Sequence, residues 1–264
     1  MIDHNRISGV LDAVRAAAPL IHNLTNNVVW NDSADAIAAL GATQATVHNV
    51  EESADLAGIA SAVSVNLETP NALWTEAARI AAGTARDVGK PWVLDPVAVG
   101  LLPYRTALAA EFQAMRPTVV KGNASKIMAL SGEAAKTHGA DSQHAPDDAA
   151  DAARSLAAAS GAVVAVTGPV DLVTDGAATV RIANGHPLMP KVIGTGCMVT
   201  PLVAACVAVA ASPFEGTVAA LALFAIAGEL AGKAADGPGT IKPRLLDSLY
   251  GLDAAQVESR LNLA

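Results

Sequence analysis

The residues with the clearest chemical potential lie in the run Gly194-Thr195-Gly196-Cys197, just before a long apolar segment. Glycine lets the backbone adopt positive φ and approach a ligand closely. We expect a helix over residues 197–211, with its unpaired N–H groups and positive dipole end facing this turn. The pattern predicts an anion site suited to a phosphoryl group in transfer, although a plain strand-to-helix connection has the same pattern. The helix field is expected to lower the pKa of the Cys197 thiol and make it a better proton acceptor.

Further polar residues follow short apolar runs at several places in the chain. We interpret these runs as strands. In open parallel sheets, ligands bind beyond the carboxyl ends of the strands. Each polar residue also has a structural interpretation, such as a turn, an exposed strand end or an Asx turn. Their shared position at one expected sheet edge favours function for the whole set, which comprises Asn66, Asp95, Lys121, Asn123 and Thr167.

The segment His22-Asn23-Leu24-Thr25-Asn26-Asn27 is rich in side-chain hydrogen-bonding groups. One interpretation is a helix start with Thr25 or Asn26 as its N-cap. The other is a loop that hydrogen-bonds a small polar ligand. The two interpretations are compatible, and both stay open.

Alternating strand and helix patterns must position these residues. Strands with a fully apolar run, such as residues 163–166, are typical of a sheet covered by helices on both faces. The alternation predicts an α/β fold with a mostly parallel central sheet flanked by helices, and a hairpin at residues 175–178. The expected strands are 45–49, 62–67, 92–95, 118–121, 162–167, 172–174 and 179–183. The expected helices are 27–40, 51–60, 72–88, 105–115, 146–159 and, after Gly194, most of the remaining chain.

We find no internal repeat or linker, so we expect one domain over residues 1–264. The polar stretch 137–148 is interpreted as a surface loop. Hydrophobic residues make up 52% of the chain and its net charge is −8, which argues against nucleic acid or an anionic membrane as partner. The apolar stretch 197–231 is interrupted by prolines and Glu215, as expected of two buried helices. Two cysteines and no apolar leader indicate a soluble protein of the reducing cytoplasm.

Ordered motifs along nearly the whole chain resemble those of the hydroxyethylthiazole kinase family, which belongs to the ribokinase-like superfamily. Most ribokinase-like enzymes carry Asp where Cys197 stands, so the cysteine is itself a discriminating feature. The matching runs are His22-Asn23-Leu24-Thr25-Asn26, Ala39-Leu40-Gly41-Ala42, Gly89-Lys90-Pro91-Trp92-Val93-Leu94-Asp95-Pro96-Val97, Pro103-Tyr104-Arg105-Thr106, Gly122-Asn123-Ala124-Ser125, Ala165-Val166-Thr167-Gly168-Pro169-Val170-Asp171, Asn184-Gly185-His186, Gly194-Thr195-Gly196-Cys197 and Gly237-Pro238-Gly239.

The resemblance implies a three-layer ribokinase-like fold, a homotrimer and a reaction. That reaction transfers the γ-phosphoryl group of ATP, with Mg²⁺, to the primary hydroxyl of 4-methyl-5-(2-hydroxyethyl)thiazole in thiamin salvage. By position, Cys197 is expected to accept the hydroxyl proton while Gly194, Thr195 and Gly196 form the anion hole. The resemblance also assigns Lys121, Asn123 and Thr167 to ATP, Gly194, Thr46 and Asn26 to the thiazole, and Asp95 to the metal or the phosphates.

Three departures from the family pattern bear on the chemistry. Lys126 stands where the family has a metal-supporting Glu; an ammonium cannot ligate Mg²⁺, although it can contact a phosphate. Lys121 replaces the usual Arg and loses its bidentate fork. Gln44 and Thr46 replace Pro and Met in a Ser-Pro-x-Met loop, which indicates a more polar alcohol or weaker thiazole binding. Glu68 also departs from a loop of small residues.

Two alternatives therefore stand beside the thiazole kinase. One is a related kinase with another small alcohol as substrate. The other is a protein that binds nucleotide or thiazole with little turnover.

Overall fold

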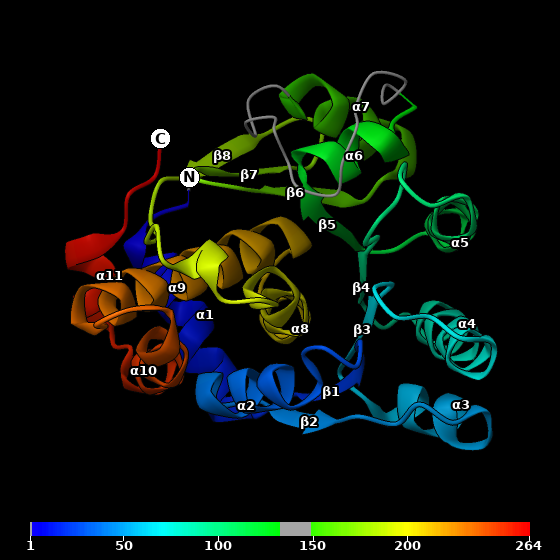
Figure 1. Ribbon diagram of the computed structural model, residues 1–264, viewed down its shortest axis with the longest axis horizontal. Coiled ribbons are helices and arrows are strands. Elements are labelled where there is room, and N and C mark those ends of the chain that lie inside the picture. Colours follow the sequence, from blue (N-terminus) through cyan, green and yellow to red (C-terminus); the bar gives the residue numbers. More distant parts are fainter. Residues whose placement is uncertain (1, 133–148) are drawn as a thin grey trace.

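The computed structural model describes residues 2–132 and 149–264. Their strands form one sheet in the order β2-β1-β3-β4-β5-β6-β7-β8 (Figure 1). Neighbours from β2 to β6 run parallel, and β7 and β8 are added antiparallel. The strands are β1 (Leu20–Leu24), β2 (Thr43–Ala45), β3 (Ala62–Asn66), β4 (Trp92–Asp95), β5 (Val119–Asn123), β6 (Val163–Thr167), β7 (Asp171–Thr174) and β8 (Thr179–Ile182).

Helices cover both faces of the sheet, as its apolar strands require. One layer is made of α3, α4, α5, α6 and α7, and the opposite layer of α1, α2, α8, α9, α10 and α11 (Figure 1). The first layer comprises α3 (Val50–Ile59), α4 (Ala72–Asp87), α5 (Pro103–Ala114), α6 (Ala124–Leu130) and α7 (Ala150–Ser160). The second comprises α1 (His4–Ala17), α2 (Trp30–Leu40), α8 (Thr195–Val207), α9 (Pro213–Ala234), α10 (Pro238–Gly251) and α11 (Ala254–Arg260).

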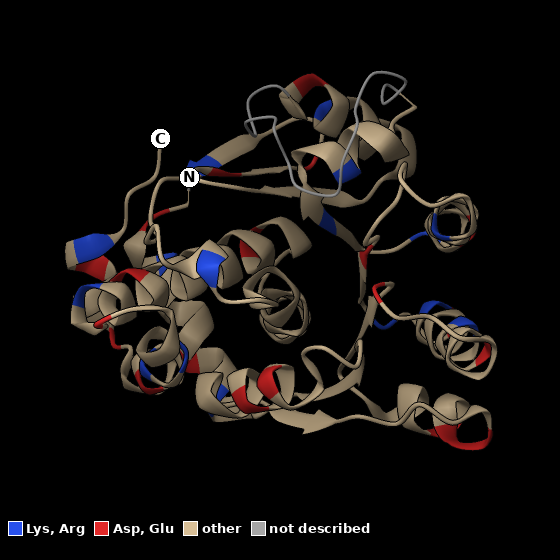
Figure 2. Cartoon of the chain, in the orientation of Figure 1, with Lys and Arg blue, Asp and Glu red and all other residues tan. Residues whose placement is uncertain are grey.

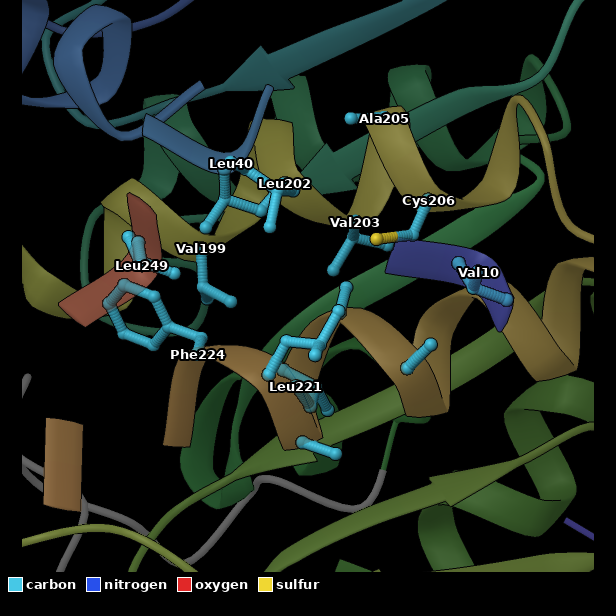
Figure 3. Close-up of a cluster of buried hydrophobic side chains, with 14 of the residues drawn as sticks. Val10, Leu40, Val199, Leu202, Val203, Ala205, Cys206, Leu221, Phe224 and Leu249 are labelled. Carbon is cyan, nitrogen blue, oxygen red and sulfur yellow. The ribbon is translucent and has the colours of Figure 1, made fainter. Parts of the chain in front are cut away.

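The largest apolar core surrounds α8, which carries no charged residue (Figure 2). Figure 3 shows Val203 of α8 and Leu221 of α9 among side chains contributed by α1, α2 and α10. Burying each such aliphatic side chain stabilises the fold by roughly 1.5–3 kcal/mol. The packing fixes α8 firmly, and with it the turn at residues 194–197.

Helix α9 is long and apolar enough to cross a membrane by length and composition alone. Most of its side chains are buried against α1, α8 and α10 within the protein. This packing explains its composition as that of a core helix, as expected from the sequence.

The mainly parallel sheet, its helical layers and the hairpin between β7 and β8 confirm the expected architecture. Strand β1 was not predicted, because His22 and Asn23 are poor strand formers in isolation. In the structure both are buried: His22 Nε2 donates to Val47 O at 2.9 Å, and Asn23 Oδ1 accepts from Ser64 Oγ at 2.8 Å. Burial lowers the pKa of His22 to about 4, so the ring is neutral.

Several boundaries also differ from those expected. The predicted strand 45–49 is wrong, since β2 lies at residues 43–45, and helices α1 and α6 were missed. The helix expected at 197–211 runs from 195 to 207, and α2 begins at Trp30 rather than at residue 27. The predicted loop 137–148 and the start of the helix expected at 146–159 lie outside the described residues, and α7 begins at Ala150.

Candidate active site

Asp95 is the buried electrostatic centre of the carboxyl edge of the sheet. It ends β4, and each of its oxygens accepts a hydrogen bond from an ammonium group at 2.9 Å. Lys121 from β5 donates to Oδ2, and Lys126 from the first turn of α6 donates to Oδ1. Burial alone would raise the pKa of Asp95, but the two ammonium groups hold it at about 2. The carboxylate is therefore ionised and permanently paired at neutral pH.

Lys121 connects Asp95 to the first turns of α8. The side chain is 1% exposed, and Nζ also donates to Gly196 O and, at 3.4 Å, to Thr200 Oγ1. Thr200 donates in turn to Asp95 Oδ2 at 3.0 Å. All three ammonium hydrogens thus have partners inside the protein. Lys121 is buried under the turn and joins α8 to the sheet, while its assignment to ATP by the resemblance stays a prediction.

The turn at Gly194 is held in one conformation by its backbone. Gly194 is the N-cap of α8 with φ of 91°, and a Cβ there would lie 1.9 Å from Val29 Cγ1. Its carbonyl accepts from the N–H groups of Cys197 at 2.8 Å and Met198 at 2.9 Å. Thr195 N–H is directed to Val192 O at 3.4 Å. Of the three residues that the resemblance assigns to an anion hole, only Thr195 has its N–H bonded in this way within the described part of the chain.

Gly196 is the open position of the turn. It is exposed, a Cβ there would have no neighbour within 4 Å, and its N–H has no protein partner among the described residues. A free N–H at the start of a helix favours an anion. Gly196 is therefore a candidate position for an anion at this turn.

Cys197 is placed directly after this open position and is 9% exposed. Its Sγ donates to Glu68 Oε2 at 3.4 Å. Burial raises the pKa of the Cys197 thiol to about 11, and the carboxylates of Asp95 and Glu68 raise it further against the effect of the two lysines. The expected lowering of this pKa by the helix terminus was wrong, because burial and the nearby acids dominate. Cys197 is a neutral thiol at neutral pH.

Amide side chains connect neighbouring strand ends at the same edge. Asn26 Nδ2 donates to Asn66 Oδ1 at 2.9 Å, and Asn66 Nδ2 donates to Asp95 Oδ2 at 3.0 Å. Asn26 Oδ1 accepts from the N–H groups of Val28 and Val29. The N-cap of α2 is Val29, so neither Thr25 nor Asn26 caps the helix in the predicted way. Asn26 is buried and orients the loop with both ends of its amide, rather than presenting a free amide to a substrate.

The other predicted residues lie at this edge with local partners. Thr46 follows β2 and donates to Gln44 Oε1 at 2.7 Å. Asn123 caps α6 by accepting from Lys126 N–H at 3.1 Å, which is the structural interpretation of this residue. Thr167 ends β6 beside Asn123 in the register of the sheet. Sequence reasoning missed Thr200, although its position four residues after Gly196 on an expected helix places both on one face.

A protein-held metal ion does not fit these residues. Mg²⁺ is usually bound through one or two carboxylates together with substrate phosphates. Both oxygens of Asp95 are already paired with ammonium groups. Among the described residues, no group of three His, Cys, Asp or Glu side chains could hold a metal ion. Asp95 therefore has an electrostatic and structural place in this site, whereas the resemblance assigned it to the metal or the phosphates.

Comparisons of the sequence and of the structure with known proteins point to the same family. Residues 11–255 match the model of the hydroxyethylthiazole kinase family. The chain is 50% identical over 242 residues to a hydroxyethylthiazole kinase of Cereibacter sphaeroides, covering 92% of each protein. The structure of a hydroxyethylthiazole kinase from Pyrococcus horikoshii aligns with a TM-score of 0.91 at 37% identity over 98% of both chains. A pyridoxal kinase from Staphylococcus aureus, in complex with AMP-PCP and pyridoxal, shares the fold with a TM-score of 0.60 at 17% identity, over 80% of this chain and 87% of that one.

Proposed function

We propose a phosphoryl-transfer mechanism for this chain, which belongs to the hydroxyethylthiazole kinase family and has a ribokinase-like fold. It is an ATP-dependent kinase of thiamin salvage that phosphorylates the primary hydroxyl of 4-methyl-5-(2-hydroxyethyl)thiazole. One observation carries the mechanism: there is free space beside Gly196, next to the Cys197 thiol, at the start of α8. Lys121 fixes this helix start by donating to the carbonyl of Gly196. Phosphoryl transfer depends mainly on positioning and electrostatic stabilisation, which such a site supplies.

In this mechanism the γ-phosphoryl group approaches the start of α8. The free N–H of Gly196 and the positive end of the helix stabilise the charge on the phosphoryl oxygens. The hydroxyl of the thiazole alcohol lies beside Cys197. Gly194 has the thiazole on its exposed side, because its other side is closed by Val29.

The adenine nucleotide extends from Gly196 toward the ends of β5 and β6. Thr167 and Asn123, the N-cap of α6, lie there next to each other in the sheet register. The pyridoxal kinase that shares this fold was solved in complex with AMP-PCP, which is in keeping with a nucleotide as ligand. Lys121 contributes indirectly, by holding the Gly196 carbonyl and so directing the opposite N–H outward.

The thiazole ring is assigned to the loops after β1 and β2. Thr46 offers a hydroxyl where an apolar contact is usual in the family, and Gln44 accepts a hydrogen bond from that hydroxyl. Asn26 shapes this side through its buried amide. We further propose that the protein is a cytoplasmic homotrimer.

The function is tested by product formation with a panel of alcohols. Purified protein with Mg²⁺ and ATP is given hydroxyethylthiazole or other small heterocyclic alcohols, and phosphorylated products are identified by mass spectrometry. We expect the thiazole alcohol to have the highest kcat/KM, and Thr46→Met to lower its KM by up to about tenfold. A higher kcat/KM for a more polar alcohol would reassign the substrate. ATP-dependent thermal stabilisation without any product would indicate a binding protein.

A further inference from the structure

Glu68 is an acidic residue that reaches the reacting side of the site from the loop after β3. Its Oε2 accepts the thiol hydrogen of Cys197 at 3.4 Å. The loop is held in place, because Glu68 N–H donates to Asn66 Oδ1 at 3.1 Å and Asn66 is bonded to Asp95. A carboxylate is thus fixed against the residue that lies nearest to the expected hydroxyl.

The state of Cys197 makes this contact important. Burial, reinforced by Asp95 and Glu68, raises its pKa to about 11, so the sulfur already carries a proton at neutral pH. A neutral thiol is a weak base, and it can accept a second proton only if it releases the first. The S–H hydrogen bond supplies a route for that release, since the accepting atom is a carboxylate oxygen.

We propose that Glu68 is the final proton acceptor of the phosphoryl transfer and acts through Cys197. As the hydroxyl oxygen of the substrate bonds to the γ-phosphorus, the bond between that phosphorus and the β–γ bridging oxygen breaks and ADP leaves. The hydroxyl proton passes to Sγ of Cys197 while the original thiol proton passes to Oε2 of Glu68. Cys197 is again a neutral thiol, and Glu68 then loses its proton to water.

Charged groups from three elements act on this pair. Lys126 of α6 attracts Glu68 and Cys197, and Lys121 of β5 favours a negative sulfur. Asp95 of β4 opposes a negative sulfur. This arrangement rests on the proposed function for its role in turnover, but the Glu68–Cys197 pair itself exists without substrate.

The first test measures the thiol without turnover. The rate of Cys197 alkylation by iodoacetamide is followed against pH in the wild type, Glu68→Gln and Glu68→Asp proteins. Cys197→Ala reports any reaction of the fully buried Cys206. Because the carboxylate opposes the thiolate, Glu68→Gln is expected to shift the alkylation midpoint to lower pH. Glu51→Gln, an exposed acid on α3, is expected to leave the midpoint unchanged.

The second test uses the kinase reaction. Glu68→Gln is expected to lower kcat about ten- to a hundredfold with little change in KM. Glu68→Asp is expected to recover part of the rate. The double variant Cys197→Ala/Glu68→Gln is expected to be no slower than Cys197→Ala, because both residues belong to one route.

Each outcome decides the proposal. A Glu68→Gln protein with the wild-type alkylation midpoint overturns it, and so does one with the wild-type kcat. Fully additive losses in the double variant also overturn it, since Glu68 would then act without Cys197. Absence of phosphorylated thiazole in the wild type contradicts the proposed function instead, and the alkylation result still decides whether the pair exists. Should Glu68→Gln unfold, Glu68→Ala, which also removes the carboxylate, gives the same two readouts.

Discussion

At the level of single residues, the site depends on the buried carboxylate of Asp95, which forms ion pairs with Lys121 and Lys126. Removing one partner of a buried ion pair leaves an uncompensated charge and costs about 3–5 kcal/mol. We expect Asp95→Asn to lower the free energy of unfolding by about this amount at pH 7, measured by urea denaturation. The exposed Asp12→Asn is the control and should have almost no effect. Wild-type stability in Asp95→Asn would contradict the central place of this carboxylate.

The same residue predicts a dependence of stability on pH. The folded pKa of Asp95 is lowered from 3.8 to about 2, so its ionised form is favoured by folding. The contribution is fully present above pH 3.8 and is lost as pH falls toward 2, with a size of roughly 2 kcal/mol. The difference between wild type and Asp95→Asn should therefore shrink over this pH range. A difference that stays constant down to pH 2 would show that Asp95 is not paired as described.

Lys126 predicts an altered metal dependence at the same scale. Lys126→Glu removes an ammonium from Asp95 Oδ1 and adds a carboxylate, which creates a cation site. We expect the Mg²⁺ concentration for half-maximal activity to fall about ten- to a hundredfold, and Mg²⁺ to raise the melting temperature of this variant. Lys126→Gln, which adds no carboxylate, separates loss of the ammonium from gain of a ligand. An unchanged Mg²⁺ requirement in Lys126→Glu contradicts the prediction.

At the level of elements, two glycines at the start of α8 are expected to differ in role: Gly194 in the stability of the fold and Gly196 in catalysis. Gly194 has positive φ and is packed on Val29, so Gly194→Ala should cost about 2–4 kcal/mol of stability. Gly196 has open space, so Gly196→Ala should keep the stability within about 1 kcal/mol. Its methyl group would stand where the phosphoryl group is expected and should lower kcat about a hundredfold. Thermal unfolding and initial rates of both variants test the contrast, which fails if Gly196→Ala is as active as wild type.

The elements also show what the sequence could predict. Strands of continuous apolar residues and the hairpin at residues 175–178 were predicted, because their patterns need no knowledge of tertiary contacts. Strand β1 was not, since the burial of His22 depends on Val47 from another loop. The strand-end residues Asp95 and Lys121 were placed correctly at one edge. Their mutual pairing, the place of Thr200 and the contact from Glu68 required the structure, because each joins residues far apart in the chain.

At the scale of the whole molecule, the sheet and both helical layers serve to bring six strand ends to one edge. That residues 1–264 form a single domain stays a prediction, as does the trimer. Several large apolar side chains are exposed on the described surface, including Leu73, Leu101 and Ile193. Sedimentation equilibrium is expected to give a mass three times that of the 26.5 kDa chain. A mass of one chain at micromolar concentration would contradict the trimer. The active site would then consist of residues from a single subunit.

The most direct test of the account is phosphoryl transfer at the start of α8. Wild-type protein and Cys197→Ala are incubated with Mg²⁺, ATP and hydroxyethylthiazole, and ADP and phosphorylated thiazole are measured together over time. We predict equal amounts of both products from the wild type and a rate about ten- to a hundredfold lower in Cys197→Ala, with nucleotide binding retained. An unchanged rate in Cys197→Ala would contradict the assignment of the Gly196–Cys197 turn as the place of the chemistry.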